Sequence, residues 1–279
     1  MSNSDVERRY TMGRSQEETE RLIQQSGLYE DITGRLLSDA GLFTGMKVLD
    51  IGSGAGDVTF AAAERVGNEG QVIGVDMNPA ILETAKARAE VMGLTNVEFM
   101  AGDVHALDLP NDFDALIGRA VLIYLPRPAE TLRQLATHLR PGGIVAFQEV
   151  EFSAYSSIAR PETPLMNQLA IWGIEVFRRS GANVGMGFDL YSAFVDAGLP
   201  EPSLGYAAPM GGPETWIGYD YIANSIRSLL PLMEAYSIAT AEEVELNTLA
   251  ERLRAEVVAS KRPLILPPHV TAWAQLRTE

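Results

Sequence analysis

The feature that most constrains the fold of this chain is a set of three glycines at alternate positions directly after an apolar segment. The segment reads Val48-Leu49-Asp50-Ile51-Gly52-Ser53-Gly54-Ala55-Gly56-Asp57. Glycines at such a point let the backbone turn tightly and approach a ligand closely, with the first N–H groups of a following helix facing it. The pattern predicts a strand, a ligand-binding turn and a helix, although any strand-to-helix turn can carry one or two glycines.

Two acidic residues follow later strand candidates and predict an adenosine site. Asp76 ends the next apolar run, 24 residues after Gly52. A carboxylate about 20 residues past a glycine turn, at the end of the second strand, is where an adenosine ribose is held. Asp103 follows the third run and either accepts a hydrogen bond from the adenine amino group or caps the next short helix.

Residues 46–150 alternate between short β-branched runs and helical pattern. The expected strands are Lys47–Ile51, Gln71–Asp76, Val97–Ala101, Phe113–Gly118 and Gly143–Val150. Asn78 and Pro79 open a helix that Gly93 closes, and Pro128 opens another that we expect to stop at Pro141-Gly142-Gly143. This alternation predicts a parallel sheet covered by helices on both faces.

The rest of the chain predicts helices around this core. Ser15 and Glu18 fit a capping box, and a second helix is expected over 28–40. Helices are expected over 164–179 and 189–197, and strands over 204–209 and 270–276. The domain prediction follows: a helical cap at 1–40, a core at 41–210 and 267–279, and a helical lid insertion at 211–266.

The lid prediction comes from the sheet topology. If the last strand is antiparallel, it begins at the carboxyl edge of the parallel strands, where ligands bind in open α/β sheets. The 211–266 insertion then leaves from and returns to that edge. Its aromatic residues Trp216, Tyr219 and Tyr221 either wall a pocket or pack the lid on the core.

Composition excludes several classes of function. The 279 residues include 22 basic and 37 acidic side chains, a formal charge of −15 that repels nucleic-acid phosphates. There is no cysteine, which excludes disulfides and thiolate chemistry. No metal-ligand spacing, signal pattern or apolar run of about 18 residues is found, so no metal and no membrane association are expected. We expect a cytoplasmic protein with a small-molecule substrate, and a homodimer stays open.

Two adenosine cofactors would fit such a site. Nicotinamide dinucleotides usually require G-x-G-x-x-G, whose third glycine would fall at position 57, where this chain has Asp. A diphosphate would also be repelled by Asp50 and Asp57, whereas a cofactor with an ammonium and a sulfonium would not. An NAD-dependent oxidoreductase is therefore disfavoured but kept as an alternative, as is a non-catalytic adenosylmethionine-binding protein.

Five motifs in order resemble those of class I S-adenosylmethionine-dependent methyltransferases, in particular the ubiquinone/menaquinone-type small-molecule group. They read VLDIGSGAGD, GVDMNP, AGDVHALDLP, FDALIGRAVLIYL and LRPGGIVAFQEV. The resemblance implies an α/β fold with a Rossmann-like seven-stranded sheet whose last strand is antiparallel, and S-adenosylmethionine as cofactor. It implies cofactor contacts at Asp50, Gly52, Gly54, Gly56, Asp76, Met77, Asp103, Val104 and Arg119, with the ribose at Asp76 and adenine near Asp103 and Val104.

The catalytic candidates lie at predicted strand ends. Methyl transfer needs a nucleophile held in line at roughly 3–3.5 Å with water excluded, and a base where the nucleophile carries a proton. Glu149 and Glu151 follow the fifth strand and share a face if that strand continues. They serve as a base or bind a cationic substrate, unless they only form hydrogen bonds within the lid or are simply solvated. Tyr124 and His269 are weaker candidates.

Overall fold

The computed structural model describes residues 16–155 and 163–278. Contacts divide the chain into two compact units. The sheet unit comprises Tyr29–Glu149, Met186–Tyr206 and His269–Glu279. The helical unit comprises Met1–Leu28, Val150–Gly185 and Ala207–Pro268. In this division residues 150–185 group with 207–268 rather than with the sheet, and the predicted cap, core and lid bounds stay predictions.

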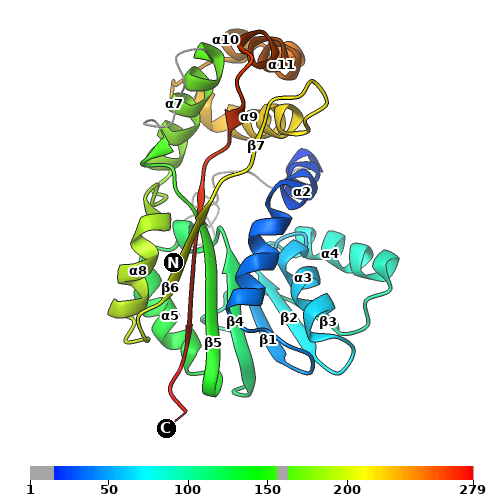
Figure 1. Ribbon diagram of the computed structural model, residues 1–279, viewed down its shortest axis with the longest axis vertical. Helices are drawn as coiled ribbons and strands as arrows, with labels where there is room; N and C mark the ends of the chain where they lie inside the picture. Colours follow the sequence, from blue (N-terminus) through cyan, green and yellow to red (C-terminus); the bar gives the residue numbers. More distant parts are fainter. Residues whose placement is uncertain (1–15, 156–162, 279) are drawn as a thin grey trace. The chain divides into compact units, whose positions relative to one another are not determined.

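The sheet unit contains a seven-stranded sheet in the order β3-β2-β1-β4-β5-β9-β6 (Figure 1). Its strands are β1 (Lys47–Ile51), β2 (Gln71–Asp76), β3 (Val97–Ala101), β4 (Phe113–Arg119), β5 (Leu139–Val150), β6 (Ser203–Ala207) and β9 (His269–Gln275). Strands β1 to β5 pair in parallel. Strand β9 is antiparallel to β5, since Leu276 donates its N–H to Gly143 and Glu151 donates to Pro268. The predicted fold class is confirmed.

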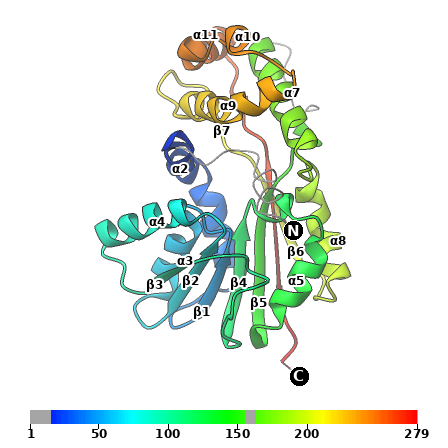
Figure 2. The same cartoon turned by 180° about the vertical axis from the view of Figure 1, so that it is seen from behind.

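Apolar residues on both faces of the strands hold the helices of the sheet unit. These helices are α2 (Gln16–Asp39, whose first part belongs to the helical unit), α3 (Asp57–Val66), α4 (Pro79–Met92), η1 (Leu122–Tyr124), α5 (Pro128–Ala136) and α8 (Met186–Asp196). On one face, Leu36 and Leu37 of α2 and Ala62 of α3 pack in one core with Val48 and Ala146. On the other face, α8 lies beside α5 (Figure 2) and contacts α5 and β9. Phe194 of α8 meets Phe147 of β5 edge to face.

The helical unit is built from α7 (Pro164–Arg179), α9 (Gly218–Ala235), α10 (Ala241–Val244), η2 (Leu246–Thr248) and α11 (Leu249–Ser260), with a two-stranded sheet of β7 (Met210–Gly211) and β8 (Leu264–Ile265). Helices α7, α9 and α11 contact one another. Leu249, Leu253 and Val257 are buried on α11 at the helical spacing seen in the sequence. The mostly helical character expected for 211–266 is confirmed.

Three local predictions need correction. Helix α2 is continuous from Gln16 to Asp39, because one glycine at position 27 costs only about 1 kcal/mol and does not stop a packed helix. Helix α5 ends at Ala136, and Pro141 to Gly143 lie inside β5. The pairing of β4 with β5 shifts register between Phe113 and Ala115. Residues 141–143 therefore form an irregularity within β5 rather than a helix stop. Ser15, of the predicted capping box, lies outside the described residues.

Candidate cofactor and substrate site

The turn after β1 requires its glycines for two separate reasons. Gly52, Gly54 and Gly56 have φ angles of 67°, 53° and 93°, in the left-handed region that disfavours other residues. A Cβ on Gly52 would lie 2.6 Å from Cγ2 of Val121, and one on Gly56 would lie 2.4 Å from Cζ of Phe60. The turn is therefore packed as tightly as a close-approach ligand loop requires.

Asp76, at the end of β2, braces this turn. Its Oδ2 accepts the N–H of Gly54 at 3.0 Å, and its Oδ1 accepts the N–H of Asn78 at 2.8 Å. The structure thus brings together two of the residues that the sequence placed at one edge. Met77 beside it is exposed. The contacts of Asp76 and Met77 with a ribose stay predictions.

Asp50 is fully buried beneath the turn and incompletely bonded. Its Oδ2 accepts the hydroxyl of Thr59 at 2.6 Å, while Oδ1 has no hydrogen-bond partner among the described residues. Burial raises the pKa of this carboxyl to about 7. The hydroxyl of Ser53 is also buried and unpartnered within the same described part of the chain. Buried polar atoms normally have partners, so these two fit a ligand that carries hydrogen-bond donors.

Asp57, the first residue of α3, lies between Arg88, which the sequence did not point to, and Arg119, a predicted cofactor contact. Its carboxylate is 2.7 Å from the guanidinium of Arg88 and 3.6 Å from that of Arg119. Arg88 also donates to the carbonyl of Ala55 at 2.6 Å, which fastens α4 to the turn. The charge of Asp57 is therefore compensated by two arginines, and the expectation that Asp50 and Asp57 repel a diphosphate stays a prediction.

The third acidic position forms a local turn. Asp103 is exposed, accepts the N–H of His105 at 3.0 Å with its side chain and accepts the N–H of Ala106 at 2.8 Å with its carbonyl. This is a local Asx-type turn, and residues 102–112 contain no helix, so the short helix that Asp103 was predicted to cap is absent. The half-buried Val104 follows it, and the adenine contact of both residues stays a prediction.

Glu149 holds the turn that follows β4. It is fully buried, and its carboxylate accepts the backbone N–H groups of Val121, Leu122 and Ile123 at 3.0, 2.8 and 3.3 Å. Burial raises the pKa of this carboxyl to about 7 despite these three bonds. Because Val121 packs against Gly52, Glu149 supports the cofactor turn through the turn after β4.

The other candidate carboxylate does not converge with it. Strand β5 ends at Val150, and Glu151 folds back so that its Oε1 accepts the N–H groups of Ser153 and Ala154 at 2.7 and 3.3 Å. Tyr124, at the end of η1, is half-buried. The structure shows these two residues in local structure, and their catalytic roles stay predictions.

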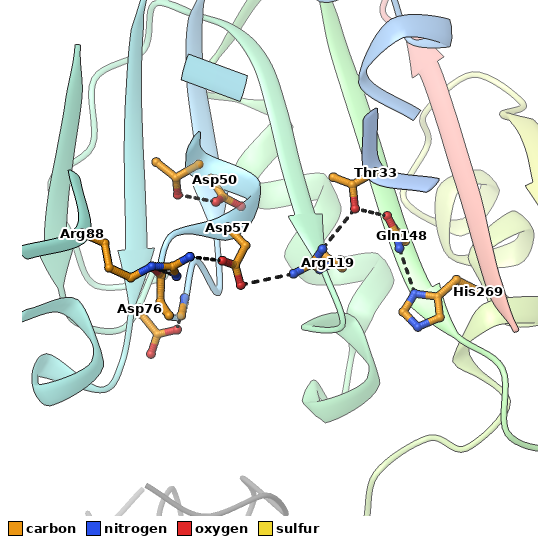
Figure 3. Close-up of polar contacts among 11 residues, drawn as sticks. Thr33, Asp50, Asp57, Asp76, Arg88, Arg119, Gln148 and His269 are labelled. Carbon is orange, nitrogen blue, oxygen red and sulfur yellow. Dashed lines mark hydrogen bonds and ion pairs between the residues drawn. The ribbon is translucent and has the colours of Figure 1, made fainter. Parts of the chain in front are cut away.

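A chain of hydrogen bonds crosses the carboxyl edge of the sheet from β4 to β9 (Figure 3). Arg119, which ends β4, donates to the hydroxyl of Thr33 at 3.1 Å. Thr33 donates to Oε1 of Gln148 at 2.8 Å, and Nε2 of Gln148 lies 2.9 Å from Nδ1 of His269. Through the ion pair of Arg119 with Asp57, this chain reaches the helix that follows the glycine turn.

Sequence reasoning missed Thr33 and Gln148 in this chain. Gln148 lies one position before Glu149 on β5, so the two side chains point to opposite faces of the sheet. Its Thr33 partner is 115 positions away and its His269 partner 121. The only sequence signal at Gln148 is that an amide side chain interrupts an otherwise apolar strand.

Metal and membrane features are lacking in the part of the chain that the structure describes. Residues 16–155 and 163–278 contain no group of His, Asp and Glu side chains that could hold a metal ion. Within the same ranges no helix is both long and apolar enough to cross a membrane.

The strand order, the glycine turn and the acidic residue after β2 together define a Rossmann-like methyltransferase fold. The family described as a methyltransferase domain matches residues 42–176. The YcgJ protein of Bacillus subtilis shares the fold, with a TM-score of 0.56 and 16% identity over 89% of this chain and 99% of that one.

Curated relatives extend this likeness to sequence. The chain is 32% identical to the ubiquinone/menaquinone biosynthesis C-methyltransferase UbiE of Pseudomonas syringae, over 57% of this chain and 67% of that protein. It is 38% identical to the aklanonic acid methyltransferase DauC of a Streptomyces species, over 48% of this chain and 62% of that protein. The chain thus spans less than two thirds of DauC. It belongs to the class I S-adenosylmethionine-dependent methyltransferases.

Proposed function

We propose that this protein transfers a methyl group from S-adenosylmethionine to an O, N or C centre of a small organic molecule. The observation that carries the proposal is the unpartnered Oδ1 of buried Asp50 directly beneath a left-handed glycine turn. An ammonium donor at that oxygen would offset the cost of burying the carboxylate. Family membership supports the same cofactor.

The chain's own residues have distinct tasks in this proposal. Gly52, Gly54 and Gly56 allow close approach of the cofactor, Asp50 binds its ammonium and Asp76 its ribose. The cofactor supplies an activated methyl group when bound. The protein then positions the acceptor in line and excludes water, which supplies much of the rate enhancement without a covalent step.

Glu149 takes a positioning role in this scheme rather than that of the base. Three backbone N–H groups occupy its carboxylate, and its link through Val121 to Gly52 sets the shape of the cofactor turn. Replacement by Gln should then change stability and adenosylmethionine affinity together. A base would instead lose roughly 10²–10⁴ in turnover with normal cofactor affinity.

The cofactor is tested by calorimetric titration with adenosylmethionine, adenosylhomocysteine and NAD. We expect both sulfur compounds to bind and NAD to give no heat. Asp76→Ala should weaken adenosylmethionine at least about tenfold, because charge-assisted hydrogen bonds contribute about 1.5–3 kcal/mol each. Glu83→Ala is the control, since this exposed residue pairs only with Lys86 on α4. Binding of NAD in place of the sulfur compounds would favour the oxidoreductase alternative.

Turnover separates an enzyme from a cofactor-binding protein. The relatives' names suggest aklanonic acid and demethylmenaquinone as first acceptors, assayed by transfer of labelled methyl from adenosylmethionine. Cofactor binding with no labelled product from a broad acceptor panel would support the non-catalytic alternative. A homodimer, a cytoplasmic location and exclusion of nucleic acid stay predictions.

The predicted lid is tested by hydrogen exchange. If residues 211–266 act as a lid, their amides should gain protection when adenosylhomocysteine and an acceptor bind, because lid segments belong to the less stable part of a structure. The α3 amides serve as an internal reference. Equal protection with and without ligands would exclude a moving lid.

A further inference from the structure

We infer that His269 is a neutral imidazole whose Nε2–H is held in place to donate a hydrogen bond to an oxygen atom of the methyl-accepting molecule. The inference rests on the proposed function, because it assumes that the acceptor binds at the carboxyl edge of the sheet. It rests on the directions of the hydrogen bonds that link Arg119, Thr33, Gln148 and His269 (Figure 3).

The direction of each bond follows from the one before it. A guanidinium has only donors, so Thr33 Oγ1 accepts from Arg119 and uses its single hydrogen on Oε1 of Gln148. The other end of the Gln148 amide is then an NH2 group, which can only donate. Nδ1 of His269 must therefore be the acceptor, and the proton of the neutral ring lies on Nε2.

Packing keeps the ring in this state. His269 is 1% exposed, and the ring of Tyr29 lies against it with 4.1 Å between centroids. A second proton would place an N–H at Nδ1 against the NH2 of Gln148, two donors face to face. Burial and the charge of Arg119 lower the pKa of His269 to about 3, which agrees with a ring that stays neutral.

The position of the ring suits a ligand contact. His269 is the first residue of β9, beside the end of β5, at the edge where ligands of open α/β sheets bind. Nε2 makes no hydrogen bond with any residue in the described ranges. In Figure 3 it lies on the side of the ring away from Gln148, in the direction in which the β4 arrow points.

The chemistry of the ring then decides what it binds. A fixed N–H selects a hydrogen-bond acceptor, such as a carbonyl or phenolate oxygen beside the methylated centre, and rejects ammonium groups. The same geometry removes His269 as a general base, because Nδ1 is occupied and Nε2 is already protonated. His269 would be a substrate-binding group, and Thr33 and Gln148 its positioning residues.

The tautomer can be read by NMR of the histidine ring nitrogens in the full chain, which contains three histidines. The other two supply opposite internal references. His105 donates from Nδ1 to Oε1 of Gln134, because an amide oxygen can only accept, and its Nε2 then accepts from the hydroxyl of Thr131. His138 donates from Nδ1 to the carbonyl of Pro110. We expect His269 alone to carry its proton on Nε2, with no titration between about pH 5 and 8. A proton on Nδ1, or titration in that range, would overturn the inference.

Gln148→Glu tests the cause. A carboxylate cannot donate, so Nδ1 of His269 should become protonated in this variant. The matched control is Gln134→Glu, which still accepts from His105 and should leave all three tautomers unchanged. An unchanged His269 signal in Gln148→Glu would show that Gln148 does not set the tautomer.

The ligand contact is tested in the adenosylhomocysteine complex with naphthoquinone as an oxygen-bearing probe and naphthalene as its oxygen-free match. Naphthoquinone should shift the Nε2–H signal and naphthalene should not. His269→Gln, which keeps an amide donor, should retain probe affinity, whereas His269→Phe should lose about 3- to 10-fold with unchanged adenosylhomocysteine binding. Equal responses to both probes, or none, would overturn the oxygen contact. Failure of the wild type to bind adenosylhomocysteine would instead sink the proposed function.

Discussion

The sequence encodes the two halves of the sheet's carboxyl edge in different ways. In the half formed by β1 and β2, the arrangement depends on backbone shape, which only particular residues allow: left-handed glycines and a strand-end aspartate that binds backbone N–H groups. In the half formed by β4, β5 and β9, the arrangement depends on side chains that meet across more than 100 positions of sequence.

The two halves also differ in how they treat buried charge. The glycine-turn half contains Asp50, whose Oδ1 has no hydrogen-bond partner among the described residues, and we propose that the cofactor supplies one. In the β5 half, Glu149 accepts three backbone N–H groups, and Gln148 is hydrogen-bonded to Thr33 and His269. In our proposals the first half binds through unsatisfied acceptors, whereas the second presents a single fixed donor at His269.

The largest expected effect is at Gly52. Gly52→Ala combines a left-handed φ with a Cβ 2.6 Å from Val121, so we expect a loss of about 2–5 kcal/mol in unfolding free energy. Gly93→Ala is the matched control, because its φ of 68° is nearly the same and nothing lies within 4 Å of the added Cβ. It should cost only about 1–2 kcal/mol. Chemical denaturation measures both, and equal losses would mean that Val121 moves aside.

The next largest effect is the pH dependence of stability that Glu149 causes. Its folded-state pKa of about 7 lies above the ordinary 4.5, so the folded protein holds the proton more tightly. The resulting stabilisation is complete below about pH 4.5 and is lost as the pH rises to about 7. At about 1.4 kcal/mol per pKa unit, the loss is about 3 kcal/mol. Glu149→Gln has no such proton, so wild type should lose about that much relative to the variant between those pH values.

The control for this experiment is Glu175→Gln. Arg179 and Arg178 lower the pKa of Glu175, so its dependence on pH has the opposite sign: its stabilisation is present at neutral pH and lost on acidification. Asp50 is present in all three proteins and cancels in the comparison. If the difference between wild type and Glu149→Gln is the same at both pH values, the folded-state pKa of Glu149 is not raised.

Sequence alone was sufficient for the β1 and β2 half because its signals are local. The five parallel strands were predicted within a few residues of their observed bounds, and Asp50, the three glycines and Asp76 came together as expected. The pairing of Asp57 with Arg88 and Arg119 could not be found the same way. The arginines lie 31 and 62 positions after Asp57 on a helix and a strand end, and no periodicity links them.

For the β5 half, residue type was informative but partner and role were not. Glu149 at the end of an apolar strand marked a site, and strand alternation directs the side chain of its neighbour Gln148 to the opposite face. Whether a strand-end carboxylate meets substrate or three backbone N–H groups depends on the path of the next turn. The path of the turn after β4 could not be predicted from the sequence, because Ala120 adopts a left-handed φ of 51° at a position where no glycine indicates it.

The smallest expected effect on stability is at Ala120, where the turn after β4 has a strained, left-handed backbone. A left-handed alanine costs about 1–2 kcal/mol of folding free energy, and replacing it by glycine removes this cost. The freer unfolded state of glycine offsets about 0.5–1 kcal/mol of the gain. Ala120→Gly should therefore stabilise the fold by about 0.5–1 kcal/mol. Lys261→Gly, at the end of α11 with a φ of 53°, relieves the same strain in the helical unit and should stabilise by a similar amount.

The two variants should differ in cofactor binding. The Ala120 N–H donates to the Gln148 carbonyl, and its neighbour Val121 packs on Gly52. Because Ala120→Gly frees this turn, it should weaken adenosylhomocysteine binding in calorimetry. Lys261→Gly should leave that affinity unchanged. Equal affinities in both variants would show that the strained turn shapes the fold without shaping the cofactor site.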